Sequence, residues 1–373
     1  MPPISVLIKP ASSLCNMACE YCFYKDVVSH RNIADLGIMD HVTHENLVKN
    51  AMSYAQGSVS FAFQGGEPTL AGLGFFQRHI ELCKKYSRSN VQIFNSLQTN
   101  GYIIDEGWAE FFSENKFLVG LSVDGPKEIH DFYRKDRKGE GTFNRIRKTI
   151  NIFDRFGVEY NLLCVVTESV AKNANKVLNF FINSGFDFLQ FIPCLDGFER
   201  EQQEWSLSPS SYADFLIKSF RKYYSSFLKK KFLSIRNFDN YISLLLGRSA
   251  ENCGMNGVCS CYFVVEGNGS VYPCDFYVTD KYCAGNVNLN SFEDIARSEI
   301  FSEFIKKSLP VSEECKDCKW FSLCRGGCRR YREPFSNEKP SLNFYCQSYK
   351  SFFNECGEQL KDMANSILNA RRY

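Results

Sequence analysis

The sequence predicts an α/β protein built on a parallel sheet, followed by a cysteine-rich C-terminal part. Short runs rich in β-branched and aromatic residues alternate with amphipathic helical stretches six times before residue 231. Serial βα units of this kind form parallel sheets, either open and doubly wound or curved into an incomplete barrel. The 17 cysteines are unevenly spread, with three in residues 15–22 and eleven in residues 253–356.

Periodicity places six strands and six helices. The predicted strands are residues 4–9, 59–64, 91–98, 118–123, 159–166 and 188–193. The predicted helices are residues 44–55, 73–86, 106–115, 143–156, 173–183 and 209–230. Thr43 and Asp105 are residue types that favour the N-cap, so two of these helices are expected to begin there. We expect a first domain over residues 1–230 and a second over residues 231–373 that ends in a helix.

Polar motifs follow the first four predicted strands. CNMACEYC comes after the first strand, GGEP after the second, QTN after the third and SVDGP after the fourth. Both parallel architectures place their chemistry at the carboxyl ends of the strands. The fold and the motifs therefore predict one site at that edge of the sheet.

Composition excludes several classes of function. The net charge of +2 gives no electrostatic basis for binding nucleic acid or a membrane surface. No apolar run approaches the roughly 18–20 residues of a membrane span, and the first residues do not resemble a secretion signal. We therefore expect a cytoplasmic protein, in which cysteines stay reduced and serve as metal ligands more readily than as disulfides.

Three cysteines on one short loop form the strongest local signal. The spacing Cys15-x3-Cys19-x2-Cys22 lets three thiolates face one metal centre, and such soft ligands suit iron–sulfur clusters or zinc. A structural zinc site would need a fourth ligand, for which His30 is an irregularly spaced candidate. An iron–sulfur cluster with three protein ligands instead leaves one iron open to a small molecule.

With Tyr21 before its last cysteine, CNMACEYC resembles the CxxxCxφC motif of the radical S-adenosylmethionine (SAM) superfamily. The resemblance implies a partial (β/α)6 barrel of the TIM type. It also implies a [4Fe–4S] cluster on Cys15, Cys19 and Cys22 whose open iron binds SAM. Electron transfer would then cleave SAM to a 5′-deoxyadenosyl radical.

Further SAM contacts follow from the same resemblance. Gly65, Gly66 and Glu67 match the segment that holds the SAM amino group; glycine permits close backbone approach, and a carboxylate accepts hydrogen bonds from an ammonium. Ser122 and Arg134 match the partners of the SAM carboxylate. Leu195 matches a contact to the adenine ring, and Tyr21 belongs to the cofactor-binding loop.

The C-terminal cysteines are numerous enough for two further sites with four thiolates each. Their spacings suit zinc ribbons as well as iron–sulfur clusters, but they resemble the SPASM extension of radical SAM enzymes, including a hairpin at residues 269–274. By that resemblance two additional [4Fe–4S] clusters are held, for a total of three, and because both are fully ligated they would transfer electrons. One would have the ligands Cys253, Cys259, Cys274 and Cys328, and the other Cys315, Cys318, Cys324 and Cys346.

Stretches along the whole chain resemble the anaerobic sulfatase-maturating enzymes, among them IKPASSLCNMACEYCFY, FAFQGGEPTLAG, CGMNGVCSC and CKWFSLCRGGCRR. The resemblance implies oxidation of a cysteine or serine in a C/S-x-P/A-x-R context of a sulfatase to Cα-formylglycine. The hydrogen atom would leave the substrate Cβ, and Asp275 would accept the proton. A low-potential donor such as ferredoxin or flavodoxin would supply electrons. The match is weakest over residues 195–209.

Two alternatives stay open at this point. One is a different SPASM peptide modifier, for example a thioether-forming enzyme. Such enzymes often carry an N-terminal recognition extension, for which a first strand at about residue 4 leaves no room. The other is a non-catalytic zinc-binding protein, which would lack the brown colour and the absorbance near 400 nm of iron–sulfur clusters.

Overall fold

A computed structural model describes residues 3–199, 201–333 and 341–370. They form two compact units. The first comprises Met1–Val123, His130–Asn161 and Cys261–Phe304, and the second comprises Asp124–Ile129, Leu162–Ser260 and Ile305–Tyr373. The units interleave along the chain, and the domain boundary expected at residue 230 stays a prediction.

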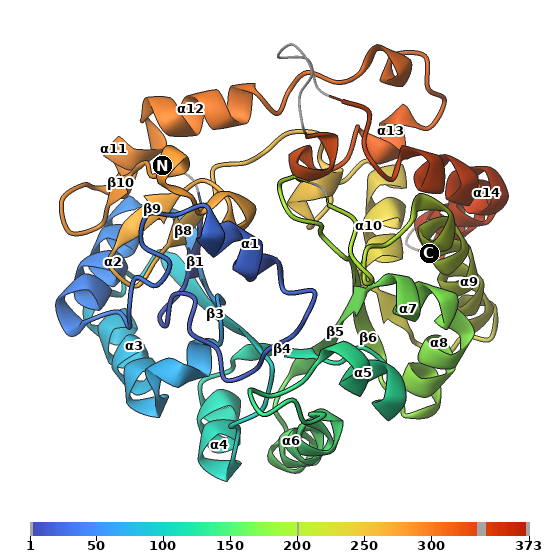
Figure 1. The fold of residues 1–373 in the computed structure, drawn as a ribbon. Helices are drawn as coiled ribbons and strands as arrows, with labels where there is room; N and C mark the ends of the chain where they lie inside the picture. Colours follow the sequence, from blue (N-terminus) through green and yellow to red (C-terminus); the bar gives the residue numbers. More distant parts are fainter. Residues whose placement is uncertain (1–2, 200, 334–340, 371–373) are drawn as a thin grey trace. The chain divides into compact units, whose positions relative to one another are not determined.

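A parallel sheet forms the centre of the first unit (Figure 1). Its strands lie side by side in sequence order: β1 (Ile4–Ile8), β2 (Gly57–Phe63), β3 (Val91–Thr99) and β4 (Leu118–Ser122). Ile8 pairs with Phe63, and Thr99 pairs with Leu121. The carboxyl ends therefore meet at one edge, and the four predicted strands are confirmed to within two residues.

A hairpin extends this sheet beyond β1. It consists of β8 (Phe263–Val265) and β9 (Ser270–Tyr272), with the two-residue strand β10 (Gly285–Asn286) next to β9. Strand β8 runs parallel to β1, and Val265 pairs with Ile8. The turn passes through Gly269 at φ +86°, a conformation that favours glycine. The predicted hairpin is confirmed, and the residues after β8 reach the same edge of the sheet as the residues after β1.

Helices cover the outer face of these strands in Figure 1: α2 (His41–Tyr54), α3 (Leu73–Tyr86), α4 (Glu106–Glu114) and α6 (Phe143–Phe156). The side chain of Asp105 accepts a hydrogen bond from the Trp108 amide at 3.1 Å, which confirms it as the N-cap of α4. The expected start at Thr43 is wrong. Asp40 caps α2 instead and accepts from the Thr43 amide at 2.7 Å, because Thr43 lies at the third position of the helix.

Aromatic side chains fill the core between this sheet and its helices. Phe61, Phe63, Phe76 and Phe112 are fully buried, and the rings of Phe63 and Phe76 lie 5.0 Å apart edge to face. Each such side chain contributes about 1.5–3 kcal/mol through burial. This core gives the carboxyl ends of the strands a rigid support.

The second unit continues the βα pattern. Its strands, also parallel, are β5 (Tyr160–Val166, which enters the unit at Leu162), β6 (Phe188–Pro193) and β7 (Ser234–Ile235). Its helices are α7 (Glu168–Lys172), α8 (Ala174–Asn183), α9 (Pro209–Leu228), α10 (Arg236–Leu245), α13 (Phe321–Cys324) and α14 (Cys346–Ala370). The last two predicted strands and the C-terminal helix are confirmed. Helix α14 packs along α9, with the rings of Phe220 and Phe352 5.6 Å apart.

Short elements complete the fold. The remaining α-helices are α1 (Phe23–Ser29), α5 (Lys127–Tyr133), α11 (Phe292–Ala296) and α12 (Glu299–Lys306). The 3-10 helices are η1 (Pro68–Ala71), η2 (Cys253–Met255), η3 (Asp275–Tyr277), η4 (Asp280–Tyr282), η5 (Glu313–Cys315) and η6 (Arg329–Arg332). The predicted α/β architecture with a parallel sheet is thus confirmed.

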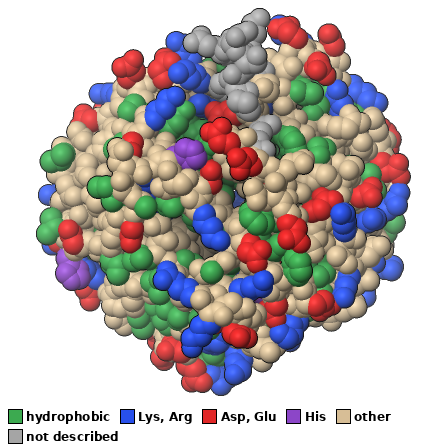
Figure 2. Space-filling view, in the orientation of Figure 1, with side chains coloured by type: hydrophobic (Ala, Val, Ile, Leu, Met, Phe, Trp, Pro, Cys, Tyr) green, Lys and Arg blue, Asp and Glu red, His purple; other side chains and the backbone are tan. Residues whose placement is uncertain are grey.

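The surface carries both signs of charge. Lys and Arg side chains are interspersed with Asp and Glu over the face displayed in Figure 2, in agreement with a net charge of +2. Among the described residues, no helix has the length and apolar character that crossing a membrane requires.

Candidate active site

The loop after β1 carries Cys15, Cys19 and Cys22 close together. Burial raises the pKa of the Cys15 thiol to about 12, and the neighbouring Cys19 and Cys22 add to the rise. Burial likewise raises the pKa of Cys22, a rise that the charges of Lys25 and Arg134 oppose. A metal ligand must be a thiolate, so a cationic iron centre would displace these protons on binding. Three adjoining soft donors fit the cluster that the motif predicts.

The GGEP segment packs directly on the cysteine loop. The Gly66 amide donates to the Ser12 carbonyl at 2.9 Å, and the Glu67 amide donates to the Leu14 carbonyl at 2.7 Å. Gly65 has φ +123°, and a Cβ on Gly66 would lie 2.1 Å from the Leu14 oxygen. Both glycines are therefore required for the loop and the segment to touch.

A Gly66→Ala substitution is expected to displace the cysteine loop, because the new methyl group would overlap the Leu14 carbonyl. Overpacking of this kind costs about 1–3 kcal/mol. We expect the iron content to fall by about one third, one cluster of three, with loss of SAM cleavage. Gly74→Ala on α3 is the matched control, since nothing lies within 4 Å of its Cβ position. Full iron content and normal SAM cleavage in Gly66→Ala would contradict this account.

Glu67 is buried and held by its own chain. Its carboxylate accepts hydrogen bonds from the Thr69 amide at 3.1 Å, from the Thr69 and Thr99 hydroxyls at 2.7 Å each, and from the Asn100 amide at 2.8 Å. Burial raises the pKa of Glu67, and these donors oppose the rise. A carboxylate offers about four acceptor positions. One oxygen takes three of these bonds and the other takes one, so a further donor would approach the second oxygen.

The structure brings Tyr21 and Arg134 together. The Arg134 guanidinium donates to the Tyr21 hydroxyl at 2.7 Å, and both side chains are buried. Ser122, at the end of β4, accepts a hydrogen bond from Gln98 at 3.0 Å. Leu195 belongs to the second unit, where it is half-buried in the loop after β6. The SAM-binding roles of these residues stay predictions.

Asn100 is a site residue for which sequence analysis predicted no role. Its side-chain amide donates to the side-chain oxygen of Asn16 at 2.8 Å and lies 3.7 Å from the Cys15 sulfur. It belongs to the QTN motif, whose position after a strand indicated the site but not the partner.

Asp275 lies in a buried polar cluster in the first unit. The Tyr24 hydroxyl donates to its Oδ2 at 2.5 Å, and the Gln64 amide donates to the same oxygen at 3.2 Å. The Lys9 ammonium lies 3.7 Å from Oδ1 and 2.9 Å from Glu266. Burial raises the pKa of Asp275, and Lys9 and Tyr24 oppose the rise. The hydrogen bonds from Tyr24 and Gln64 fix the orientation of the carboxyl group.

Arg31 completes this cluster from the end of α1. It lies 2.9 Å from Glu266 and donates to the Val278 carbonyl at 2.5 Å. The two cations Lys9 and Arg31 balance the two carboxylates of Glu266 and Asp275 when both are ionised. Burial alone would raise the pKa of Glu266, but Lys9 and Arg31 outweigh it and hold that pKa below its ordinary value.

One set of C-terminal cysteines surrounds a hollow in the second unit. The lining of this hollow includes Cys315, Cys318, Cys324 and Cys346. Burial raises the pKa of Cys324 to about 12, and the other three thiols add to the rise. Four converging soft donors around such a space fit a fully ligated cluster.

The four cysteines of the second predicted set belong to different compact units. Cys253, Cys259 and Cys328 belong to the second unit. Burial raises the pKa of Cys328 to about 12, and Cys253 and Cys259 add to the rise. Cys274 belongs to the other unit, so its place in this set stays a prediction. In the part of the chain that the structure describes, no three His, Cys, Asp or Glu side chains form a preformed site for a single metal ion.

A Cys318→Ser substitution is expected to remove one of the three clusters and thus about one third of the iron. It should slow peptide oxidation more than SAM cleavage, because it removes a cluster that is expected to accept the electron from the substrate. Iron analysis and product quantification check this. Cys261→Ser is the control, since that exposed thiol belongs to no predicted set. Two zinc ions bound to the unsubstituted C-terminal part would contradict the electron-transfer role.

Comparisons with known proteins agree with this geometry. Residues 10–174 match the Radical SAM superfamily, and residues 253–319 match SPASM, an iron–sulfur cluster-binding domain. The chain is 51% identical to the cysteine-type anaerobic sulfatase-maturating enzyme of Clostridium perfringens, over 98% of this chain and 100% of the relative. It is 31% identical to the serine-type enzyme of Bacteroides thetaiotaomicron, over 98% and 92% of the two chains.

Solved structures show the same likeness. A structure described as native anSMEcpe with bound AdoMet and Cp18Cys peptide superposes with a TM-score of 0.93 at 50% identity, covering 98% of this chain and 100% of that chain. Streptococcus suis SuiB bound to precursor peptide SuiA has a TM-score of 0.67 at 16% identity over 92% and 76% of the two chains. The latter is a likeness of fold alone.

Proposed function

Because this chain belongs to the family of anaerobic sulfatase-maturating enzymes, within the radical SAM superfamily, we propose that it oxidises a cysteine of a sulfatase to Cα-formylglycine. The observation that carries this proposal is the 51% identity to a cysteine-type enzyme along the whole chain, against 31% to a serine-type enzyme. The enzyme uses SAM and three [4Fe–4S] clusters.

Cys15, Cys19 and Cys22 would hold the SAM-site cluster, and the two C-terminal sets would hold the others. When both are bound, the cluster at Cys15 and SAM would supply the radical that abstracts a hydrogen atom from the substrate Cβ. Seven residues would bind and orient SAM: Tyr21, Gly65, Gly66, Glu67, Ser122, Arg134 and Leu195. Two hydrogen bonds support this assignment by fixing side chains near the cysteine loop: Glu67 accepts from the Asn100 backbone amide, and Arg134 donates to the Tyr21 hydroxyl.

Asp275 would act as the proton acceptor. The substrate cysteine loses a hydrogen atom from Cβ, the proton of its thiol and one further electron, which the C-terminal clusters would accept, and becomes a thioaldehyde. Water then replaces the sulfur and leaves formylglycine and hydrogen sulfide. A base next to the reacting thiol must take the proton, and the buried carboxylate of Asp275 beside Lys9 supports the proposal that it is this base.

The partners follow from the same chemistry. We expect a polypeptide with a C/S-x-P/A-x-R sequence, cysteine being favoured at the oxidised position, and a low-potential electron donor such as ferredoxin or flavodoxin. We propose the cytoplasm as its location, where the 17 cysteines stay reduced. The family membership favours this activity over a thioether-forming modifier and over a zinc-binding protein.

An anaerobic incubation with SAM, a reductant and a Cys-x-Pro-x-Arg peptide tests the proposal. Mass spectrometry is expected to find the peptide with its cysteine sulfur replaced by an aldehyde oxygen. A product that has lost two hydrogens but retains its sulfur would instead indicate a thioether. No change in the peptide, with SAM cleaved, would contradict the substrate assignment.

A further inference from the structure

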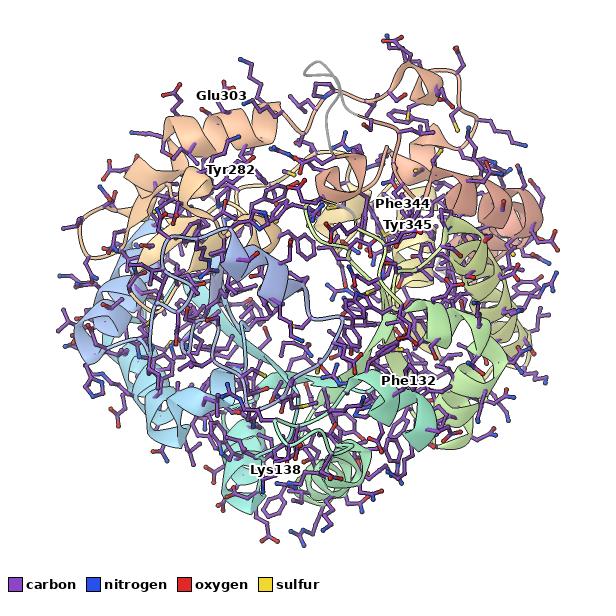
Figure 3. The ribbon with its side chains drawn as sticks, viewed as in Figure 1. Phe132, Lys138, Tyr282, Glu303, Phe344 and Tyr345 are labelled. Atoms are coloured by element: carbon purple, nitrogen blue, oxygen red, sulfur yellow. The ribbon has the colours of Figure 1, made fainter. Side chains whose placement is uncertain are left out.

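The end of β6 and the loop that follows it accept hydrogen bonds from side chains at three backbone carbonyls. The loop residues Leu195 and Asp196 line a small hollow together with Arg330, Tyr331 and Tyr345, and all of them belong to the second unit. Tyr345 and the adjoining Phe344 are labelled in Figure 3. Neither the proton acceptor nor a cluster accounts for this arrangement.

Three side chains donate to backbone carbonyls of the last residue of β6 and of the loop. The Tyr331 hydroxyl donates to Pro193 at 3.1 Å, and the Tyr345 hydroxyl donates to Cys194 at 3.1 Å. The Arg330 guanidinium donates to Asp196 at 2.9 Å. It also stacks 4.2 Å above the ring of Phe198. The backbone on both sides of Leu195 is therefore held by side chains, so its position depends on them.

The donors come from segments that carry cluster ligands. Arg330 and Tyr331 follow Cys328 in η6, and Tyr345 immediately precedes Cys346 at the start of α14. The rings of Tyr331 and Tyr345 lie 5.2 Å apart. The Phe344 amide also donates to the Tyr331 carbonyl at 2.8 Å.

Asn343 ties the two segments together. Its amide donates to the Gly326 carbonyl at 3.0 Å, and its side-chain oxygen accepts from the Tyr345 amide at 2.9 Å. A Cβ on Gly327 would lie 2.4 Å from the Asn343 nitrogen, so this contact requires glycine. The turn between Cys324 and Cys328 and the residues before Cys346 thus form one rigid support for the loop.

We propose that Tyr331 and Tyr345 are positioning residues that hold Leu195 against the adenosyl group of SAM. Cys328 and Cys346 belong to the two C-terminal sets of cysteines, and through these two residues the sets would hold both tyrosines in place. The inference rests on the proposed function, in which Leu195 contacts the adenine ring. It means that SAM affinity depends on side chains that act only through the loop.

The expected effect follows from the hydrogen bonds. Each hydrogen bond stabilises the loop, and its removal leaves a buried carbonyl without that donor. Removing both hydroxyls should raise the Kd for SAM about tenfold, which corresponds to about 1.4 kcal/mol. Ring packing is retained in phenylalanine, so the clusters should stay intact.

The test compares the cluster-loaded Tyr331→Phe/Tyr345→Phe double variant with the unsubstituted enzyme. Equilibrium dialysis without reductant gives the Kd for SAM, iron analysis gives the cluster content, and turnover at saturating SAM gives kcat. We expect the raised Kd, unchanged iron, and a kcat within about twofold. Amide hydrogen exchange in residues 194–198 should quicken in the variant even before SAM is added.

Tyr223→Phe is the matched control, because it deletes a buried hydroxyl in the same unit that donates to Asp239 at 2.5 Å and not to the loop. The inference fails if the Kd in the double variant stays within about twofold, if the control shows the same rise, or if the rise accompanies loss of iron. Should the double variant not fold, Tyr345→Phe alone should raise the Kd about threefold, and no rise would equally overturn the inference. Dialysis needs no peptide, so failure here is distinct from failure to form formylglycine.

Discussion

An Asp275→Asn enzyme should cleave SAM and retain all three clusters but form little formylglycine. Asparagine has nearly the same shape, so the contacts with Tyr24 and Gln64 can persist. It cannot accept the thiol proton, and it removes the negative charge that faces Lys9. General-base catalysis typically contributes about 10²–10⁴-fold, so the rate of peptide oxidation should fall at least 100-fold.

The decisive quantity is formylglycine formed per 5′-deoxyadenosine. In the unsubstituted enzyme the two products are coupled, whereas in Asp275→Asn the ratio should fall toward zero. Asp280→Asn is a suitable control, because this nearby exposed carboxylate lies outside the Asp275 cluster and accepts a hydrogen bond from the backbone amide of Asn32 at 2.8 Å. An unchanged ratio in Asp275→Asn would show that another group is the base.

Replacing Cys15, Cys19 and Cys22 together by alanine is expected to abolish 5′-deoxyadenosine formation. The three thiols are the predicted ligands of the SAM-site cluster, and burial with mutual proximity already couples them. The two C-terminal sets lie elsewhere in the chain, so about two thirds of the iron should remain, two clusters of three. The expected loss of activity is complete, because no other cluster would have an open iron.

Iron content and 5′-deoxyadenosine are measured on the same anaerobic sample. Cys283→Ala is the control, since this thiol belongs to no predicted set and bonds only weakly to the Gly285 carbonyl, at 3.8 Å. SAM cleavage at the normal rate in the triple variant would rule out a radical mechanism at this loop. Loss of all iron would instead mean that the three sites do not assemble independently.

Periodicity and motif spacing predicted the parts of the fold that depend on local sequence. The six strands, the cap at Asp105 and the hairpin around Gly269 are set by patterns that span a few residues. The cap of α2 was predicted wrongly because Asp40 and Thr43 are both good N-cap residues. Only the backbone path decides between them.

The contacts within the site depend on pairing between distant segments and could not be predicted. Asp275 meets Tyr24 and Lys9 because β8 pairs in parallel with β1, a register that no local pattern encodes. Glu67 was expected to bind a ligand from its motif alone. Its hydrogen bonds with Thr99 and Asn100 arise only when β2 and β3 lie side by side.

The most direct test of the proposed reaction follows the Cβ hydrogen of the substrate. A Cys-x-Pro-x-Arg peptide with two deuterium atoms on the cysteine Cβ is incubated anaerobically with the enzyme, SAM and reductant. We predict one deuterium in 5′-deoxyadenosine, one in the aldehyde of the peptide, and one sulfide released per formylglycine. Unlabelled 5′-deoxyadenosine, or a modified peptide that keeps both its sulfur and both deuterium atoms, would contradict oxidation at Cβ.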